Sequence, residues 1–180
     1  MGSERHARTP GVIPSMSDDG RRVVLCIGNI LNRDEGLGVH ALALLAPKLA
    51  GRSGVELVDG GVRGLDLLPL VESCSHLLVL DAADTGRPPG VVVELARDEI
   101  PLFGGVKMSE HQITFQEVLG LASIRGKLPP FLHLLGVQPA DVSVGVEMSP
   151  VVAAVIPHVC DRALAILAGW DLAPTGPTEG

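Results

Sequence analysis

Aromatic side chains are almost missing from this 180-residue chain, which has three Phe, one Trp and no Tyr. Proteins that stack single-stranded nucleic acid on aromatic rings need more of them. Basic residues are also scarce, because 14 Lys and Arg face 21 Asp and Glu and the formal net charge is -7. A phosphate backbone would be repelled by such a surface. We therefore expect no nucleic-acid partner.

Cysteines are few as well: Cys26, Cys74 and Cys160 are the only three, and no two have CxxC spacing. This number and spacing argue against a disulfide framework and a thiolate zinc site, and they fit a reducing cytoplasm. Arg21 and Arg22 precede an apolar run, as in a twin-arginine export signal, but polar residues soon interrupt that run. No apolar run approaches the roughly 20 residues that span a bilayer, so we expect a cytoplasmic protein without a membrane partner.

The remaining composition is that of one globular domain. Hydrophobic residues make up 46% and charged residues 19% of the chain, whose length suffices for a single core. Residues 1–20 and 171–180 are rich in Gly, Pro and polar residues without periodicity. We expect a disordered N-terminal tail over 1–20, a domain over 21–170 and a flexible C-terminal tail over 171–180.

Short apolar runs bounded by Gly, Pro or Asp predict five strands. Because these runs are apolar on both faces and alternate with helical segments, they favour a mostly parallel sheet covered on both sides. We predict an α/β fold, a three-layer α/β/α sandwich around a mostly parallel, twisted five-stranded sheet. The predicted strands are Val23–Ile27, Val55–Val58, Leu77–Leu80, Val91–Leu95 and Phe131–Val137.

Helices are predicted where apolar residues recur with a period near 3.6. The last helix also has a start signal, with Ser149 as N-cap and Pro150 in the first turn. The three apolar stripes are Leu37, Ala41, Leu44 and Leu45; Phe115, Val118, Leu119 and Ala122; and Val152, Val155, Ile156, Val159, Ala163 and Ile166.

The segment Val24–Gly38 (VLCIGNILNRDEGLG) turns an apolar strand into a helix through a loop that carries Asp34 and Glu35. A strand, a glycine-containing turn and a helix are typical of phosphate binding. The dinucleotide fingerprint would need a glycine at Cys26, however, and the two carboxylates would repel phosphate. The loop is better suited to a metal ion or another positive group.

Two further residues can join Glu35. Asp81 ends the third predicted strand, in the segment HLLVLDAAD, and in a sheet of order 2-1-3 it would share one crevice with Glu35. Ser109 and Gln112 form a capping box that places His111 in the exposed first turn of a helix. Two carboxylates and an imidazole, with coordination positions left open, suit a divalent cation such as nickel or zinc.

Each of these residues also has an interpretation without catalysis. Glu35 and Asp34 would complement the positive end of the first helix. Asp81 would cap a turn, and His111 would be a solvated surface histidine. The chain contains no G-x-S-x-G elbow and no H-E-x-x-H signature, and none of its cysteines stands in a nucleophile context that would indicate a different catalytic site.

In their order and spacing, the segments around Glu35, Asp81 and His111 resemble the nickel-iron hydrogenase maturation endopeptidases. The resemblance runs from about Arg22 to Leu167 and includes VDGGVRGLDLL and LHLLGVQP. The family often has G-x-G-N where this chain has Cys26 followed by IGN. We expect that small buried thiol to alter the packing beneath the loop and not the chemistry.

The resemblance implies an endopeptidase that removes the C-terminal extension of a hydrogenase large-subunit precursor after nickel insertion. It implies that Glu35, Asp81 and His111 are the catalytic and metal-binding residues, and that the substrate supplies the nickel. The metal would polarise the scissile carbonyl or activate water, and direct attack by a carboxylate, as in an aspartyl endopeptidase, stays open.

Two other classes of function remain at this point. One is a non-catalytic nickel-sensing or metallochaperone-like binding module, which would need the same three ligands. The other is a nucleotide-binding α/β protein, against which the carboxylates argue.

The other polar and glycine residues singled out by the sequence are expected to serve the structure. We expect Asp34, Asp59 and Asp84 either to orient the ligands or to shape the loops. We also expect a sharp turn at Gly60-Gly61 and Gly64, beside a solvent-facing Arg63. The histidines expected to be structural are His40, His133 and His158.

Overall fold

A single sheet of order β2-β1-β3-β6-β4, with β5 paired to β3, lies at the centre of the computed structural model, which describes residues 20–102, 107–108 and 115–172. Strands β1, β2, β3 and β6 are parallel, whereas β4 is antiparallel to β6 and β5 is antiparallel to β3. The strands are β1 (Arg22–Ile27), β2 (Val55–Gly61), β3 (His76–Asp84), β4 (Val92–Ala96), β5 (Lys107–Met108) and β6 (Phe131–Val137).

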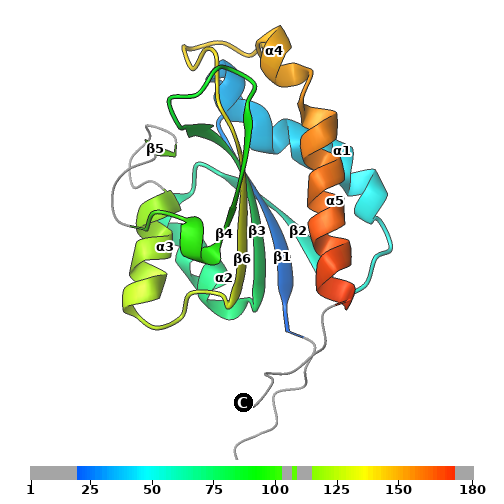
Figure 1. Ribbon diagram of the computed structural model, residues 1–180, viewed down its shortest axis with the longest axis vertical. Coiled ribbons are helices and arrows are strands. Elements are labelled where there is room, and N and C mark those ends of the chain that lie inside the picture. The colour runs from blue at the N-terminus through cyan, green and yellow to red at the C-terminus, as the bar shows by residue number, and fades with distance from the viewer. Residues whose placement is uncertain (1–19, 103–106, 109–114, 173–180) are drawn as a thin grey trace, which may run out of the picture.

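Helices cover both faces of this sheet (Figure 1). Helices α1 and α5 pack on one face, and α2 and α3 pack on the other. The three-layer sandwich predicted from the sequence is thereby confirmed. The helices are η1 (Arg33–Gly36), α1 (Leu37–Leu49), η2 (Gly64–Leu67), α2 (Leu68–Ser73), η3 (Arg97–Glu99), α3 (Phe115–Ile124), α4 (Pro150–Ala153) and α5 (Ile156–Leu172), where η denotes a 3-10 helix.

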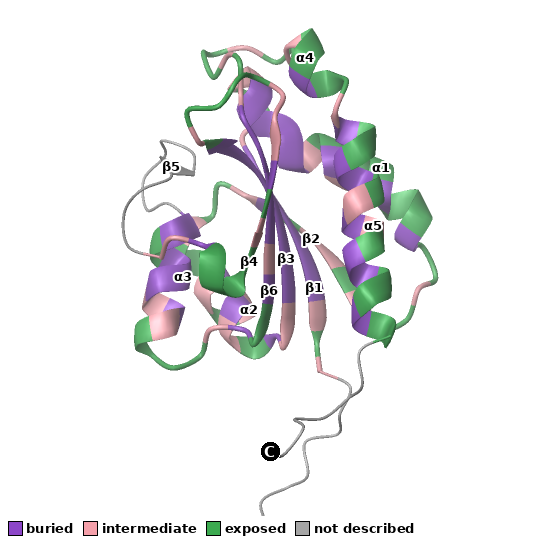
Figure 2. Cartoon of the chain, viewed as in Figure 1, coloured by how far each residue is buried: buried purple, intermediate pink, exposed green. Residues whose placement is uncertain are grey.

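Successive residues of the central strands enter different layers of the core, as the pleat of a strand requires. In β3, Leu78 and Leu80 pack in the layer of α1 and α5, while Leu77 and Val79 pack in the layer of α2 and α3. All four are fully buried, and Figure 2 shows the central strands as the most continuously buried part of the chain. This double burial explains why the strands are apolar at nearly every position.

Three local features differ from the sequence prediction. Leu44 is 44% exposed, because it lies about 60° from the centre of the stripe formed by Leu37, Ala41 and Leu45. The last predicted helix is divided into α4 and α5 by a turn at Ala154. Strand β5 has no counterpart among the five predicted strands, since two residues are too few to show a periodic pattern.

The segment from Pro150 to Leu172 is 23 residues long and, by length and composition only, apolar enough to cross a membrane. On that measure, the expectation that no run approaches the bilayer-spanning length is wrong. One side of the segment nevertheless packs against the sheet, which is the behaviour of a core helix. The buried residues on that side are Val152, Ile156, Val159, Cys160, Ala163, Ile166, Leu167 and Trp170.

The C-terminal boundary of the folded part lies slightly beyond residue 170. Helix α5 continues to Leu172, and Asp171 forms ion pairs with Arg22 and Arg52. The other residues predicted as tails, 1–19 and 173–180, lie outside the described part of the chain.

The close contact between α1 and β1 generates a prediction about Gly38. A Cβ at this position would lie 2.0 Å from the Ile27 carbonyl oxygen, so Gly38→Ala must push the helix off the strand. We expect a loss of about 1 to 3 kcal/mol in the free energy of unfolding, measured by urea denaturation.

Gly169→Ala is the matched control, because a Cβ at Gly169 in α5 would meet nothing within 4 Å. Alanine is the better helix former, so this variant should gain about 0.5 to 1 kcal/mol. Equal effects of the two substitutions would contradict the packing argument.

Candidate active site

Strands β1 and β3 are neighbours, and this adjacency creates the site. Residues Arg22–Cys26 pair in parallel with His76–Leu80, which confirms the 2-1-3 order expected from the sequence. The loop that carries Glu35 leaves the carboxyl end of β1, and Asp81 follows Leu80 on β3. The loop after β1 and strand β3 therefore bring the two carboxylates to the carboxyl end of two adjacent parallel strands, where ligands bind in open α/β folds.

Asp81 does not end its strand, in contrast to the sequence prediction. Strand β3 continues to Asp84, because Ala82 pairs with Val137 of β6 and Ala83 pairs with Met108 of β5. The pairing of β3 with β1 stops at Leu80, one residue earlier. Asp81 thus lies in a continuous strand at the point where its neighbour on one side turns away.

The loop that carries Glu35 is tightly closed by backbone hydrogen bonds. The Asn29 N–H donates to the Glu35 carbonyl oxygen at 3.0 Å, and the Glu35 N–H donates to the Asn32 carbonyl oxygen at 3.0 Å. A Cβ at Gly28 would lie 2.1 Å from the Glu35 carbonyl oxygen, so only glycine fits there. Gly28 and Asn29 thus shape this turn.

Both carboxylates are buried, whereas the sequence predicted an open crevice. Glu35 is 3% exposed and Asp81 is fully buried. Burial raises the pKa of Asp81 well above its ordinary value; the adjacent Ala82 N–H acts in the opposite direction, and the charge of Glu35 raises the pKa further. Among the described residues, no N–H or O–H group has the distance and angle of a hydrogen bond to either Asp81 carboxylate oxygen.

Asp34, the neighbour of Glu35, is also fully buried, but its oxygens are saturated. Its Oδ2 accepts hydrogen bonds from the N–H groups of Ala140 (2.8 Å) and Asp141 (2.9 Å) and from the Ser149 hydroxyl (2.8 Å). Its Oδ1 accepts the Ser149 N–H at 2.7 Å. Asp34 therefore fastens the segment 138–149 to the loop after β1, which confirms its loop-shaping role.

This arrangement also corrects the prediction for Ser149. The residue occupies the N-cap position of α4, but its side chain makes no capping hydrogen bond. Its hydroxyl donates to the Asp34 carboxylate at 2.8 Å, and this hydrogen bond orients the side chain toward Asp34.

The loop after β2 is shaped by its own polar groups. Asp59 Oδ1 accepts the Gly61 N–H at 2.9 Å, and Arg63 donates to the carbonyl oxygens of Asp59 and Gly60. Gly61 and Gly64 have φ values of 49° and 52°, the left-handed region that glycine favours. The expected sharp turn and the loop-shaping role of Asp59 are confirmed, and Arg63 braces this loop.

A buried glutamine that the sequence did not single out organises the loop after β3. Gln138 Oε1 accepts hydrogen bonds from the N–H and hydroxyl of Thr85 and from the Arg87 N–H, and its Nε2 donates to Asp84 Oδ1. Asp84 Oδ1 also accepts the Gly86 N–H, which confirms its loop-shaping role. The position of Gln138 directly after a strand was the only signal in the sequence.

His111 lies in the segment 109–114, outside the described residues, together with Ser109 and Gln112 of the expected capping box. Among the described residues, no group of three His, Cys, Asp or Glu side chains is placed to hold a metal ion. The structure therefore brings together Glu35 and Asp81, and the assignment of the three site residues stays a prediction.

The cysteines take no part in the site. All three are buried and none forms a disulfide, as the sequence predicted. Burial raises the pKa of the Cys26 thiol well above its ordinary range and that of Cys74 to about 11. A protonated thiol is a poor nucleophile, so Cys26 acts as a packing residue beneath the loop.

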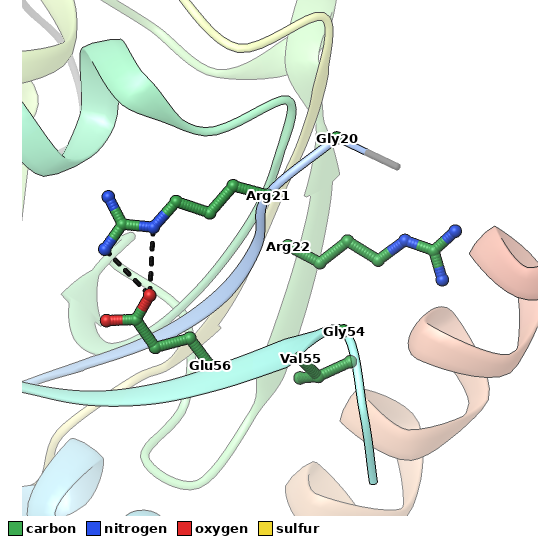
Figure 3. Close-up of a pocket in the computed structure, with 6 residues that line it drawn as sticks. All are labelled: Gly20, Arg21, Arg22, Gly54, Val55 and Glu56. Atoms are coloured by element: carbon green, nitrogen blue, oxygen red, sulfur yellow. Dashed lines mark hydrogen bonds and ion pairs between the residues drawn. The ribbon is translucent and has the colours of Figure 1, made fainter. Parts of the chain in front are cut away.

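A surface pocket lies far from these carboxylates, at the amino end of β1 (Figure 3). Its two arginines extend in opposite directions: Arg21 pairs with Glu56, and Arg22 pairs with Asp171. Because both guanidinium groups are engaged and Glu35 follows the other end of β1, this pocket is separate from the candidate site.

Comparisons with known proteins agree with one another. Residues 39–166 match the family model described as hydrogenase maturation protease. The hydrogenase expression/formation protein HupD of Bradyrhizobium diazoefficiens is 41% identical over 162 residues, which cover 89% of this chain and 84% of that protein. The hydrogenase 2 maturation protease of Escherichia coli is 33% identical over 148 residues, 82% of this chain and 90% of that protein.

The solved structures give the same result. The hydrogenase maturating endopeptidase HybD from Escherichia coli superposes with a TM-score of 0.73 at 31% identity, over 83% of this chain and 93% of that chain.

The burial of Asp81 predicts that Asp81→Asn stabilises the protein by an amount that grows with pH. Because the pKa of Asp81 is raised in the folded state, the folded protein retains a proton that the unfolded chain releases. Its contribution to stability is intact below its ordinary pKa of 3.8 and is lost as the pH rises through the raised value. Melting temperatures from about pH 4 to about pH 8 measure the difference. A constant difference across this range would rule out the raised pKa.

The hydrogen bonds of Asp34 generate a second prediction. Asp34→Ala leaves three N–H groups and one hydroxyl without their acceptor, and we expect a loss of about 3 to 5 kcal/mol in the free energy of unfolding. Amide hydrogen exchange should accelerate at Ala140, Asp141 and Ser149. Asp98→Ala is the control, because Asp98 is exposed and its long ion pair contributes little. Unchanged exchange at those three amides would refute the fastening role.

Proposed function

Because the chain belongs to the hydrogenase maturation protease family and is a peptidase, we propose that it processes a nickel-iron hydrogenase. The proposed reaction is removal of the C-terminal extension from the large-subunit precursor after nickel has been inserted. The precursor is the protein partner, and its bound nickel ion is the feature that the peptidase recognises.

The observation that carries the proposal is the pair of buried carboxylates, Glu35 in the loop after β1 and Asp81 on β3. A carboxylate without hydrogen-bond donors is expensive to bury, and Asp81 has none of full geometry among the described residues. The nearby charge of Glu35 increases that cost. A divalent cation could replace the proton that the raised pKa keeps on Asp81 and balance the charge of Glu35, since carboxylate oxygens are suitable ligands for it. This arrangement fits a site that is completed only when the substrate brings its metal.

His111 is proposed as the third ligand. Met108 pairs with Ala83, two residues after Asp81 on β3, and His111 follows Met108 by three residues. Three residues of chain span at most about 11 Å, a length that would allow His111 to join the two carboxylates. Two carboxylates and one imidazole leave coordination positions open for the substrate's own ligands.

Nickel held between enzyme and substrate would polarise the scissile carbonyl or activate a water molecule. The contribution of this chain is to orient the ion through Glu35, Asp81 and His111 and to keep bulk water away from it. We place the reaction in the cytoplasm, in line with three reduced, buried cysteines.

The experiment compares nickel-loaded with nickel-free precursor, each incubated with the purified chain. We expect a single cut near the C-terminus of the nickel-loaded precursor, detected by mass spectrometry, and no cut of the nickel-free form even when free nickel or zinc is added. Equal cleavage of both forms would overturn recognition of substrate-borne nickel and leave the peptidase assignment intact.

Substitution of the proposed ligands tests their roles. Glu35→Gln, Asp81→Asn and His111→Ala should each lower the processing rate by at least about 100-fold, because a lost ligand removes several kcal/mol of transition-state stabilisation. Asp59→Asn should be milder, since Asp59 shapes the neighbouring loop. Wild-type rates in all three ligand variants would show that these residues serve only the fold.

A further inference from the structure

Exposed apolar side chains gather at the carboxyl end of the parallel strands, where the candidate site lies. Among the described residues, seven of the twelve exposed large hydrophobic residues lie in the segments that follow β1, β2 and β6. A concentration of this kind at one end of a soluble domain is typical of an interaction surface. The seven are Ile30, Leu31, Val62, Leu65, Val142, Val144 and Val146.

Four of these residues, Ile30, Leu31, Val144 and Val146, form what we call the apolar rim. They are 50%, 59%, 84% and 69% exposed, respectively. Their two segments are joined edge to edge, because the Gly145 N–H donates to the Leu31 carbonyl oxygen at 2.8 Å. Residues 30–31 and 144–146 therefore present one surface.

The segments that carry the apolar rim are held in place by further contacts. The Arg33 N–H donates to the Gly145 carbonyl oxygen at 2.9 Å, and the Arg33 side chain pairs with Asp141 at 3.3 Å. Arg33 also has a φ of 47°, a conformation that costs a non-glycine residue about 1 kcal/mol or more. Together with the hydrogen bonds of Asp34, these contacts hold the two backbone segments of the rim in place.

Two residues of the apolar rim, Ile30 and Leu31, belong to the loop that carries Glu35, and the rim has an acidic border. Three residues separate Leu31 from Glu35 along the chain. Asp141 and Glu147 are the charged residues of the segment 138–149; Asp141 and Arg33 neutralise each other as an ion pair, which leaves the negative charge of Glu147. An occupant of this surface should therefore carry apolar side chains bordered by Lys or Arg.

We propose that the apolar rim is the docking surface for the protein substrate, which contacts it through an apolar patch with a basic border. This inference rests on the proposed function and names the part of the enzyme that binds the precursor away from the metal. A second copy of this chain is a poorer occupant, because it would bring the same acidic border and a net charge of -7.

The test separates binding from chemistry by measuring initial cleavage rates against the concentration of nickel-loaded precursor. Leu31→Ser and Val144→Ser should each raise KM about tenfold and leave kcat within about twofold, because the rim touches substrate away from the scissile bond. Ile124→Ser is the matched control: Ile124 is 73% exposed at the end of α3, and its replacement should change neither constant.

The acidic border has its own variant. Glu147→Gln should raise KM modestly and reduce the dependence of KM on salt, because exposed charges act through a screened field. An unchanged KM in both rim variants overturns the proposal, as does an equal rise in the Ile124 variant. Loss of self-association in the rim variants, seen by analytical ultracentrifugation with precursor binding intact, would identify a second copy as the occupant and also overturn it.

Failure of the proposed function is distinguishable from failure of this inference. If the wild-type chain cuts no precursor, the proposed function fails, and the rim is tested by the Kd for precursor in the same variants. A Kd raised about tenfold supports docking at the rim, and an unchanged Kd refutes it.

Discussion

The buried carboxylate of Asp34 is the interaction on which the site end of this molecule depends. It links the loop after β1 to the segment after β6 through four hydrogen bonds to three residues more than a hundred positions away. A charge can be buried when every lone pair finds a donor, and here the donors are mostly backbone N–H groups that would otherwise lack partners. One side chain thereby fastens the loop that carries Glu35 to the segment that carries Val144 and Val146 of the apolar rim.

Asp81 lies at the same end of the sheet but differs from Asp34 in its hydrogen bonds. Both carboxylates are fully buried, but Asp34 has its donors and Asp81 has none of full geometry among the described residues. The hydrogen bonds of Asp34 hold the fold together, whereas Asp81 has, in the described part of the chain, no comparable set of donors to stabilise its ionised form. The nearby charge of Glu35 further disfavours the ionised form of Asp81. This contrast is the reason why we propose Asp81, and not Asp34, as a residue of the active site.

The predictions from sequence succeeded where a repeating pattern or a local turn preference decides the outcome. The stripe of α3, the apolar strands and the turn at Gly61 all follow from such short-range rules. The failures have non-local causes. Strand β3 runs past Asp81 because β6 and β5 supply partners for Ala82 and Ala83. The Ser149 hydroxyl accepts no hydrogen bond from its own helix, because it is oriented by donation to Asp34, which only folding places beside it.

The family and the α/β sandwich follow from the sequence alone, since residue type, spacing and periodicity are properties of the chain. The burial of Glu35 and Asp81, the hydrogen bonds that Asp34 accepts and that Asp81 lacks among the described residues, and the contact between residues 30–31 and 144–146 follow only from the folded structure. These properties depend on which donors, charges and backbone segments become neighbours on folding. Residues more than a hundred positions apart become neighbours only when the sheet assembles.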